Sequence, residues 1–176
     1  VPVAFQEDAD VSTSATRPAI STIIATVSIE GAANGVLVDG VFSESFATTL
    51  LETMGSGKHG TGQKGELVGS RFAALSDAPV DSSLIPRPTS VDQSNSGILY
   101  GNRFMLKLFR VLEEGPSAEY EIGRFLLTRA GYLGVPPLAG VVEYRGPGEE
   151  PGTLGALFDF VENQGDAWAL TMNALD

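Results

Sequence analysis

The chain has 176 residues, of which 43% are hydrophobic, so it can bury a core as one domain or as two small ones. Its net charge of -11 argues against nucleic acid or an anionic membrane surface as a general partner, because both require a basic surface. It contains no cysteine, which excludes disulfide bonds and thiolate metal sites. No segment approaches the apolar length of a membrane span and no signal peptide is visible, so we expect a cytoplasmic chain.

The first part of the chain is rich in β-branched residues and predicts strands. Residues 21–29 and 36–42 are separated by glycine and asparagine, a pattern that predicts a β-hairpin. Ser43 is a typical helix cap, and apolar residues at helical spacing predict a helix over residues 43–54. A further strand is predicted over residues 66–75.

A glycine-rich loop at residues 55–65 contains a misleading motif. Its sequence GSGKHG (55–60) matches G-x-G-x-x-G, but a dinucleotide site requires a strand before the motif and a helix after it. Here the predicted helix precedes the motif and a strand follows. The motif is not a Walker loop either, since His59 follows Lys58 where serine or threonine is required. We therefore predict a mobile connection without a phosphate role, in which His59 is an exposed residue and not a ligand.

A proline-rich and serine-rich stretch near residues 76–90 predicts a boundary between two units. The fold class predicted from this division is α+β, with a small antiparallel-sheet cap at residues 1–88 and a second domain at 89–176. We expect residues 1–80 to form one antiparallel sheet crossed by the 43–54 helix. Residues 91–165 are expected to form a second antiparallel sheet, flanked by a helix over residues 116–129.

Lys107 is one of only three lysines and lies inside the apolar run Phe104–Phe109. A lysine is almost never fully buried unless it is paired, so this ammonium group needs an anionic partner. A loop of small polar residues and a strand precede it, and an acidic helix start at residues 117–121 follows. This order is typical of the ATP-holding lobe of a protein-kinase-like fold. The alternative is a hairpin whose lysine extends to water along its aliphatic stem.

Four separated runs of sequence resemble the nucleotide lobe of bacterial maltokinases. They are DQSNSGILYGNRFMLKLFR (92–110), EIGRFL (121–126), VPPLAGVVEYR (135–145) and FVENQGDAW (160–168). This family, often fused to trehalose synthase, phosphorylates maltose at its reducing end with ATP and magnesium. Residues 1–88 resemble the family's N-terminal cap more loosely, and they lack its opening helix with a tryptophan-containing motif.

The resemblance implies a set of nucleotide-binding residues. Helix geometry alone leaves Glu119 and Glu121 both open as partners of Lys107, and only the resemblance favours Glu121. A partner is required because it is costly to remove a lysine ammonium from water inside a strand, and a carboxylate at close range offsets that cost. The implied ATP-binding set comprises Lys107 and Glu121 at the phosphates, the loop residues Gln93, Ser94, Asn95 and Ser96 over them, and backbone groups of Asp159, Phe160 and Val161 at adenine.

The residues that such a kinase needs for catalysis do not follow this set. A catalytic aspartate, an asparagine and a metal-binding aspartate belong to a second lobe, and no such group follows residue 161. We therefore expect an inert N-terminal fragment with half of an ATP site and no catalytic or metal-binding residues. Mg²⁺, maltose, a C-terminal kinase lobe and a trehalose synthase domain would belong to the full-length enzyme. Two alternatives stay open: a non-catalytic regulatory module with a kinase-lobe shape, and a related kinase acting on glucose or an amino sugar.

Overall fold

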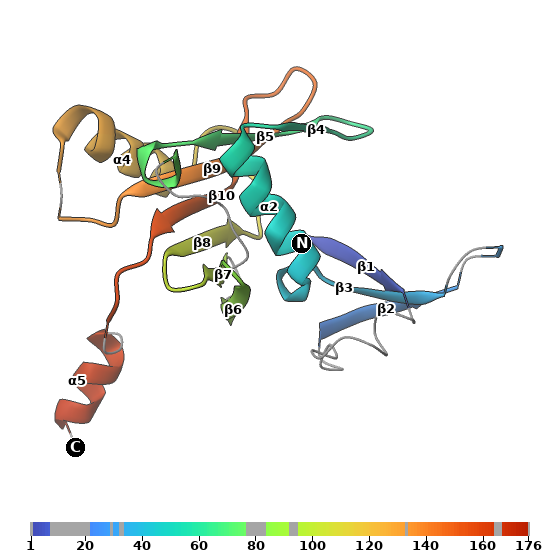
Figure 1. The fold of residues 1–176 in the computed structure, drawn as a ribbon, viewed down its shortest axis with the longest axis horizontal. Helices are drawn as coiled ribbons and strands as arrows, with labels where there is room; N and C mark the ends of the chain where they lie inside the picture. The colour runs from blue at the N-terminus through green and yellow to red at the C-terminus, as the bar shows by residue number, and fades with distance from the viewer. Residues whose placement is uncertain are drawn as a thin grey trace.

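The computed structural model describes residues 2–7, 22–28, 30–31, 34–76, 84–91, 95–132, 134–163 and 167–175, and the chain is an α+β protein (Figure 1). Its strands are β1 (Val3–Glu7), β2 (Ile23–Val27), β3 (Gly35–Asp39), β4 (His59–Thr61), β5 (Glu66–Arg71), β6 (Pro86–Val91), β7 (Asn95–Tyr100), β8 (Phe104–Phe109), β9 (Leu138–Arg145) and β10 (Gly152–Asp159). Its helices are the short 3₁₀ turn η2 (Gly40–Phe42), α2 (Glu44–Ser56), α3 (Ala73–Ser76), α4 (Ala118–Phe125), the π-helical turn η3 (Leu126–Ala130) and α5 (Ala167–Leu175).

The first three strands form a small antiparallel sheet in the order β1-β3-β2. The pairing of β2 with β3 confirms the hairpin predicted from the β-branched runs. Asp39 ends β3 and caps η2, where its carboxylate accepts a hydrogen bond from the Val41 N–H at 3.2 Å. This turn packs on β6 and β7 and so brings the small sheet against the large one.

The second sheet has seven antiparallel strands in the order β4-β5-β9-β10-β8-β7-β6. Pairing among β7, β8, β9 and β10 confirms the predicted antiparallel sheet within residues 91–165. Pro86 and Pro88 lie in the edge strand β6, where a residue without an N–H donor is tolerated. Part of the predicted linker, residues 77–83, lies outside the described residues.

The prediction that residues 1–80 form one sheet is wrong for β4 and β5. The glycine-rich loop contains β4, which pairs with β5, and β5 in turn pairs with β9 from Glu66↔Arg145 to Arg71↔Gly140. Both strands thereby extend the second sheet. The local pattern that predicts a strand carries no information about which distant strand will be its neighbour. The division of the chain into domains at residue 88 stays a prediction.

Helix α2 packs on the seven-stranded sheet, and the prediction that it crosses the first sheet is wrong. Ser43 caps it as expected, accepting a hydrogen bond from the Phe46 N–H. A glycine at residue 69 lets the helix approach closely, because a Cβ there would lie 2.1 Å from the Thr53 carbonyl oxygen. Buried Tyr100 donates a hydrogen bond from its hydroxyl to the Ala47 carbonyl at 2.7 Å, and burial raises the pKa of this phenol.

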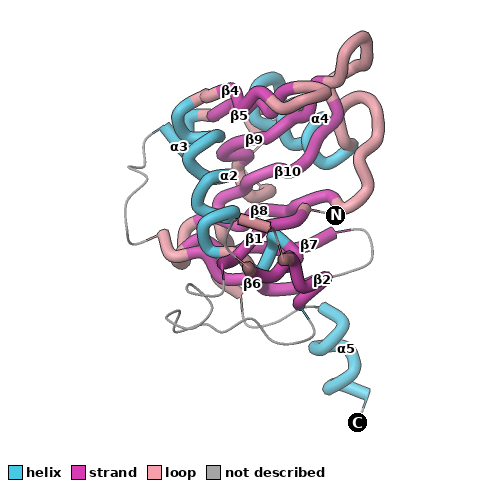
Figure 2. The backbone as a smooth tube through the Cα atoms, turned by 90° about the vertical axis from the view of Figure 1, so that its right-hand side faces the viewer, coloured by secondary structure: helices cyan, strands magenta, loops and turns pink. Residues whose placement is uncertain are grey.

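The opposite face of the sheet carries α4, as Figure 2 shows. Ser117 caps α4 by accepting a hydrogen bond from the Tyr120 N–H, and Gly131 ends the following π-helical turn with a φ of 58°. The predicted 116–129 helix is therefore confirmed, with a change of helix type after Phe125.

The last helix, α5, extends away from both sheets (Figure 1). It exposes large apolar side chains, among them Trp168, Leu170 and Leu175, each about three-quarters exposed. In the described part of the chain, no helix combines the length and the apolar character that a membrane span requires.

Candidate functional site

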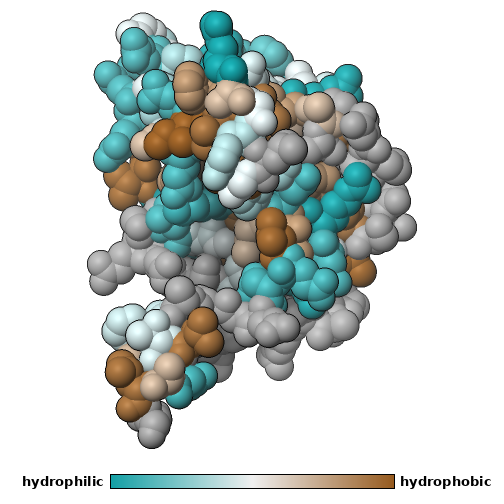
Figure 3. Space-filling model, turned by 90° about the vertical axis from the view of Figure 1, so that its left-hand side faces the viewer, coloured by the Kyte–Doolittle hydropathy of each residue, from teal (hydrophilic) through white to brown (hydrophobic). Residues whose placement is uncertain are grey.

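An open hollow of about 570 Å³ lies between α4, β8 and the segment that follows β10. Its walls are mostly apolar, with a single ammonium–carboxylate pair among them. Figure 3 views the molecule from the side on which α4 and α5 lie. The hollow is lined by Met105, Lys107, Glu119, Ile122, Gly123, Leu126, Val135, Pro136, Phe158, Asp159, Phe160, Val161 and Asn163.

Strand alternation places Lys107 on the wall of this hollow. Phe104, Leu106 and Leu108 are buried on the α2 side of the sheet, so Met105, Lys107 and Phe109 face the α4 side. The predicted orientation of Lys107 toward a carboxylate of the next helix is confirmed.

The partner of Lys107 is Glu119, to which its ammonium group donates a hydrogen bond. The implied pairing with Glu121 is therefore wrong for this structure. Both carboxylates lie in the first turn of α4, on either side of buried Tyr120, so the orientation of the helix over β8 decides which of them meets the lysine. The two paired side chains are 35% and 43% exposed, so water and a ligand can both reach them.

The end of β10 and the segment that follows it also line the hollow. The Asp159 N–H donates to the Pro137 carbonyl at 3.0 Å and the Phe160 N–H donates to the Arg103 carbonyl at 2.7 Å. These bonds hold the segment in place and occupy both amides. Asp159, Phe160 and Val161, whose backbone groups the resemblance assigns to adenine, all line the hollow.

The carboxyl group of Asp159 has a shifted pKa. Burial raises its pKa above the ordinary value, and the Arg103 guanidinium offsets part of that effect. The charged form of Asp159 is therefore disfavoured at this position.

The predicted phosphate loop is only partly described. Gln93 and Ser94 lie outside the described residues. Asn95 pairs with Phe109 and so lies on the same face of the sheet as Lys107, where it lines a smaller neighbouring hollow. Ser96 pairs with Leu108 and points to the opposite face, where its hydroxyl accepts a hydrogen bond from Arg110. The Ser96 side chain and the Lys107 ammonium are thus on different faces of the sheet.

The arrangement suits a flat apolar group joined to an anionic one. Apolar side chains would hold the flat group, and the Lys107 ammonium would meet the anion. Among the residues that the structure describes, no group of three or more histidine, aspartate or glutamate side chains is close enough to hold a metal ion.

Sequence reasoning did not identify most of the apolar wall. Ile122 and Leu126 follow a helical spacing that is equally typical of a helix packed on a core, so nothing in their pattern indicated a ligand wall. Phe158 and Met105 come from neighbouring strands, and only the pairing Phe158↔Met105 brings them together.

The fold is similar to that of solved sugar kinases. A structure of glucosamine kinase in complex with glucosamine, ADP and inorganic phosphate matches with a TM-score of 0.52 and 15% sequence identity, over 86% of this chain and 36% of that one. A second structure, glucosamine kinase in crystal form B, matches with a TM-score of 0.50 and 18% identity, over 86% of this chain and 37% of that one. No protein-family model matches the chain.

The chain therefore has a kinase-like fold and spans little more than a third of the length of these two proteins. This finding agrees with the kinase-lobe interpretation of the strand order around Lys107. At such low identity the similarity concerns the fold alone.

Proposed function

We propose that the chain is the nucleotide-binding part of an ATP-dependent sugar kinase. The observation that carries this proposal is the pair Lys107–Glu119 in the wall of an apolar hollow that residues 159–161 also line. In a kinase fold, the phosphate-binding lysine and the adenine-binding segment line the same cleft. The similarity to glucosamine kinase structures, one of them containing ADP, supports the same assignment.

In this proposal the Lys107 ammonium binds the ATP phosphates and Glu119 orients it. Lys107 comes from an interior strand of the seven-stranded sheet, paired on both sides, so its backbone is held in place while the end of its side chain stays accessible. Glu119 takes the role that the maltokinase resemblance assigns to Glu121. The predicted contacts of Gln93, Ser94 and Asn95 with the phosphates remain part of the proposal.

Adenine would lie between the apolar walls and bond to the segment after β10. Since the amides of Asp159 and Phe160 already donate to protein carbonyls, the Asp159 carbonyl and the Val161 N–H are the groups we assign to the base. A ring bound there would contact Met105 and Phe158, which line the same hollow.

Maltose is the acceptor that the sequence resemblance favours. An amino sugar is the second candidate, favoured by the structural similarity to glucosamine kinase. A second lobe would bind the sugar and supply Mg²⁺ ligands. Its presence is supported by the exposed apolar side chains of α5, because side chains of this kind are ordinarily covered in a folded protein.

Titration of the ¹⁵N-labelled chain with ATP tests the nucleotide site. We expect a weak affinity, roughly high micromolar to millimolar, because half a cleft leaves the phosphates in water where salt screens them. Signals near Lys107 and Val161 should shift, and Lys107→Ala should remove the phosphate-dependent part. Lys58→Ala, which changes an exposed lysine next to β4, serves as the matched control. Shifts that depend on Lys58 instead would assign the phosphates to the glycine-rich loop and refute the proposal.

Assays of the whole protein with maltose and glucosamine test the acceptor. The proposal expects ATP consumption that depends on one of these sugars and is lost in Lys107→Ala. The isolated chain should show no such turnover, because in this proposal the base for the sugar hydroxyl belongs to the second lobe. Sugar-dependent turnover by the isolated chain would contradict its description as half of a kinase site.

A further inference from the structure

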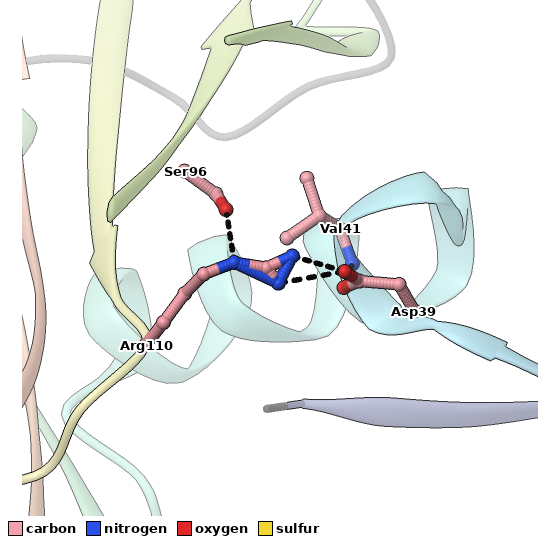
Figure 4. Close-up of polar contacts among 4 residues, drawn as sticks. All are labelled: Asp39, Val41, Ser96 and Arg110. Carbon is pink, nitrogen blue, oxygen red and sulfur yellow. Dashed lines mark hydrogen bonds and ion pairs between the residues drawn. The ribbon is translucent and has the colours of Figure 1, made fainter. Parts of the chain in front are cut away.

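A nearly buried ion pair joins the first sheet to the strand that carries Lys107. Figure 4 shows the Arg110 side chain, which follows β8, between Asp39 at the end of β3 and Ser96 in β7. The Arg110 Nη1 donates to the Asp39 Oδ2 at 2.7 Å, and its Nη2 donates to the same oxygen. Its Nε donates to the Ser96 Oγ at 3.1 Å.

Each polar group of this cluster has a defined partner. The second carboxylate oxygen of Asp39, Oδ1, accepts the Val41 N–H at 3.2 Å, and the Ser96 side chain is almost completely buried. The side chains of Arg110 and Asp39 are only 11% and 13% exposed. A pair with so little water around it is sensitive to geometry, and removal of one partner leaves a poorly solvated charge. The planar guanidinium donates to both neighbours from three separate nitrogens, a geometry that the single ammonium nitrogen of a lysine does not reproduce.

The cluster lies directly beside the candidate phosphate site but on the other face of the sheet. Ser96 precedes Gly97, and Gly97 is the direct cross-strand partner of Lys107. Arg110 comes directly after the last residue of β8. It therefore lies at the same end of the β7–β8 pair as Lys107. Asp39 is the only member of this cluster that comes from the first sheet.

We propose that Arg110 is a positioning residue for the nucleotide phosphates: held by Asp39, it fixes the β7–β8 end at which Lys107 lies. The first sheet then acts on nucleotide binding through a contact with the back of the sheet, without touching the ligand. This inference rests on the proposed nucleotide function. It predicts that the cluster controls the affinity for the phosphate part of ATP and leaves the adenine part unaffected.

The test compares ATP with adenosine, which lacks the phosphates, on the 176-residue chain. Arg110→Lys, Asp39→Asn and Ser96→Ala should each weaken ATP binding by about 5- to 20-fold, a range typical of coupling between sites. Adenosine binding, measured by the same NMR titration, should stay within about twofold of the original chain. Arg145→Lys is the matched control, since its contact with Glu66 is a 4.0 Å pair on the surface and should affect neither ligand.

Different results identify which inference fails. Equal losses for ATP and adenosine would show a merely structural role and overturn the proposal. Unchanged ATP affinity in the three variants, with Lys107→Ala still weakening it, would overturn this inference and leave the proposed function intact. Absence of ATP binding by the original chain would overturn both. Circular dichroism checks folding, and if Arg110→Lys does not fold, Ser96→Ala decides the question because it removes only one hydroxyl.

Discussion

The substitution Gly69→Ala tests where α2 docks. A Cβ at residue 69 would lie 2.1 Å from the Thr53 carbonyl oxygen, whereas ordinary contacts begin at 3.4 Å. The neighbouring atoms belong to the backbone of α2, so the helix itself would have to move away from β5 by the difference between these distances. Overpacking of this kind costs about 1–3 kcal/mol, and a backbone clash places Gly69→Ala at the upper end, at about 3 kcal/mol.

Urea unfolding followed by circular dichroism measures this loss. With a slope of about 2 kcal/mol per molar urea, the midpoint should fall by about 1.5 M. Gly60→Ala is the control, because a Cβ at Gly60 in β4 would meet Leu67 at a comfortable 3.8 Å. We expect this control to change the free energy of unfolding by less than about 1 kcal/mol. Equal effects of the two substitutions would refute the close packing of α2 on β5.

Three further predictions concern single side chains. Tyr100→Phe should lower the free energy of unfolding by about 1 kcal/mol in the same urea assay, because it removes a buried hydrogen bond to α2. In a chain with ¹³C-methylated lysines, Glu119→Gln should shift the Lys107 NMR signal more than Glu121→Gln does, since the ion pair is with Glu119; equal shifts would contradict the pairing. The raised pKa of Asp159 means that its ionisation disfavours the fold. The difference in stability between the original chain and Asp159→Asn should thus be constant below the ordinary aspartate pKa, and the original chain should lose stability relative to the variant as pH rises through the raised pKa. Thermal unfolding of both chains from pH 3 to pH 7 measures this difference. A difference that stays constant over the whole range would contradict the prediction.

The elements that the sequence predicted correctly are those encoded by neighbouring residues. Ser43 and the apolar spacing after it specify α2, and the alternation around Lys107 specifies which face of β8 the lysine occupies. The partner of β5 was not predictable in this way. Its neighbour is β9, and that choice depends on the simultaneous packing of α2 on both strands.

In the site, too, features set by neighbouring residues were predictable and features set by distant contacts were not. Chemistry alone predicts that Lys107 needs a carboxylate, and it has one. The choice of Glu119 depends on how α4 is oriented over the sheet, with Tyr120 buried beneath it. The contact of Arg110 with Asp39 joins segments far apart in the chain, and no local pattern indicates it.

The pairing of β5 with β9 has a consequence for the order of folding. β5 can pair with β4 early, but its other neighbour, β9, comes much later in the chain, and closing so large a loop early in folding carries an entropic penalty. During synthesis α2 can dock on β5 first, and the part of its apolar face that packs on β9 stays open until β9 leaves the ribosome. The β7–β8 hairpin can pair as soon as it is made, because only Gly101–Arg103 separate its strands. We therefore expect the strand of Lys107 to pair with β7 before α2 has docked completely.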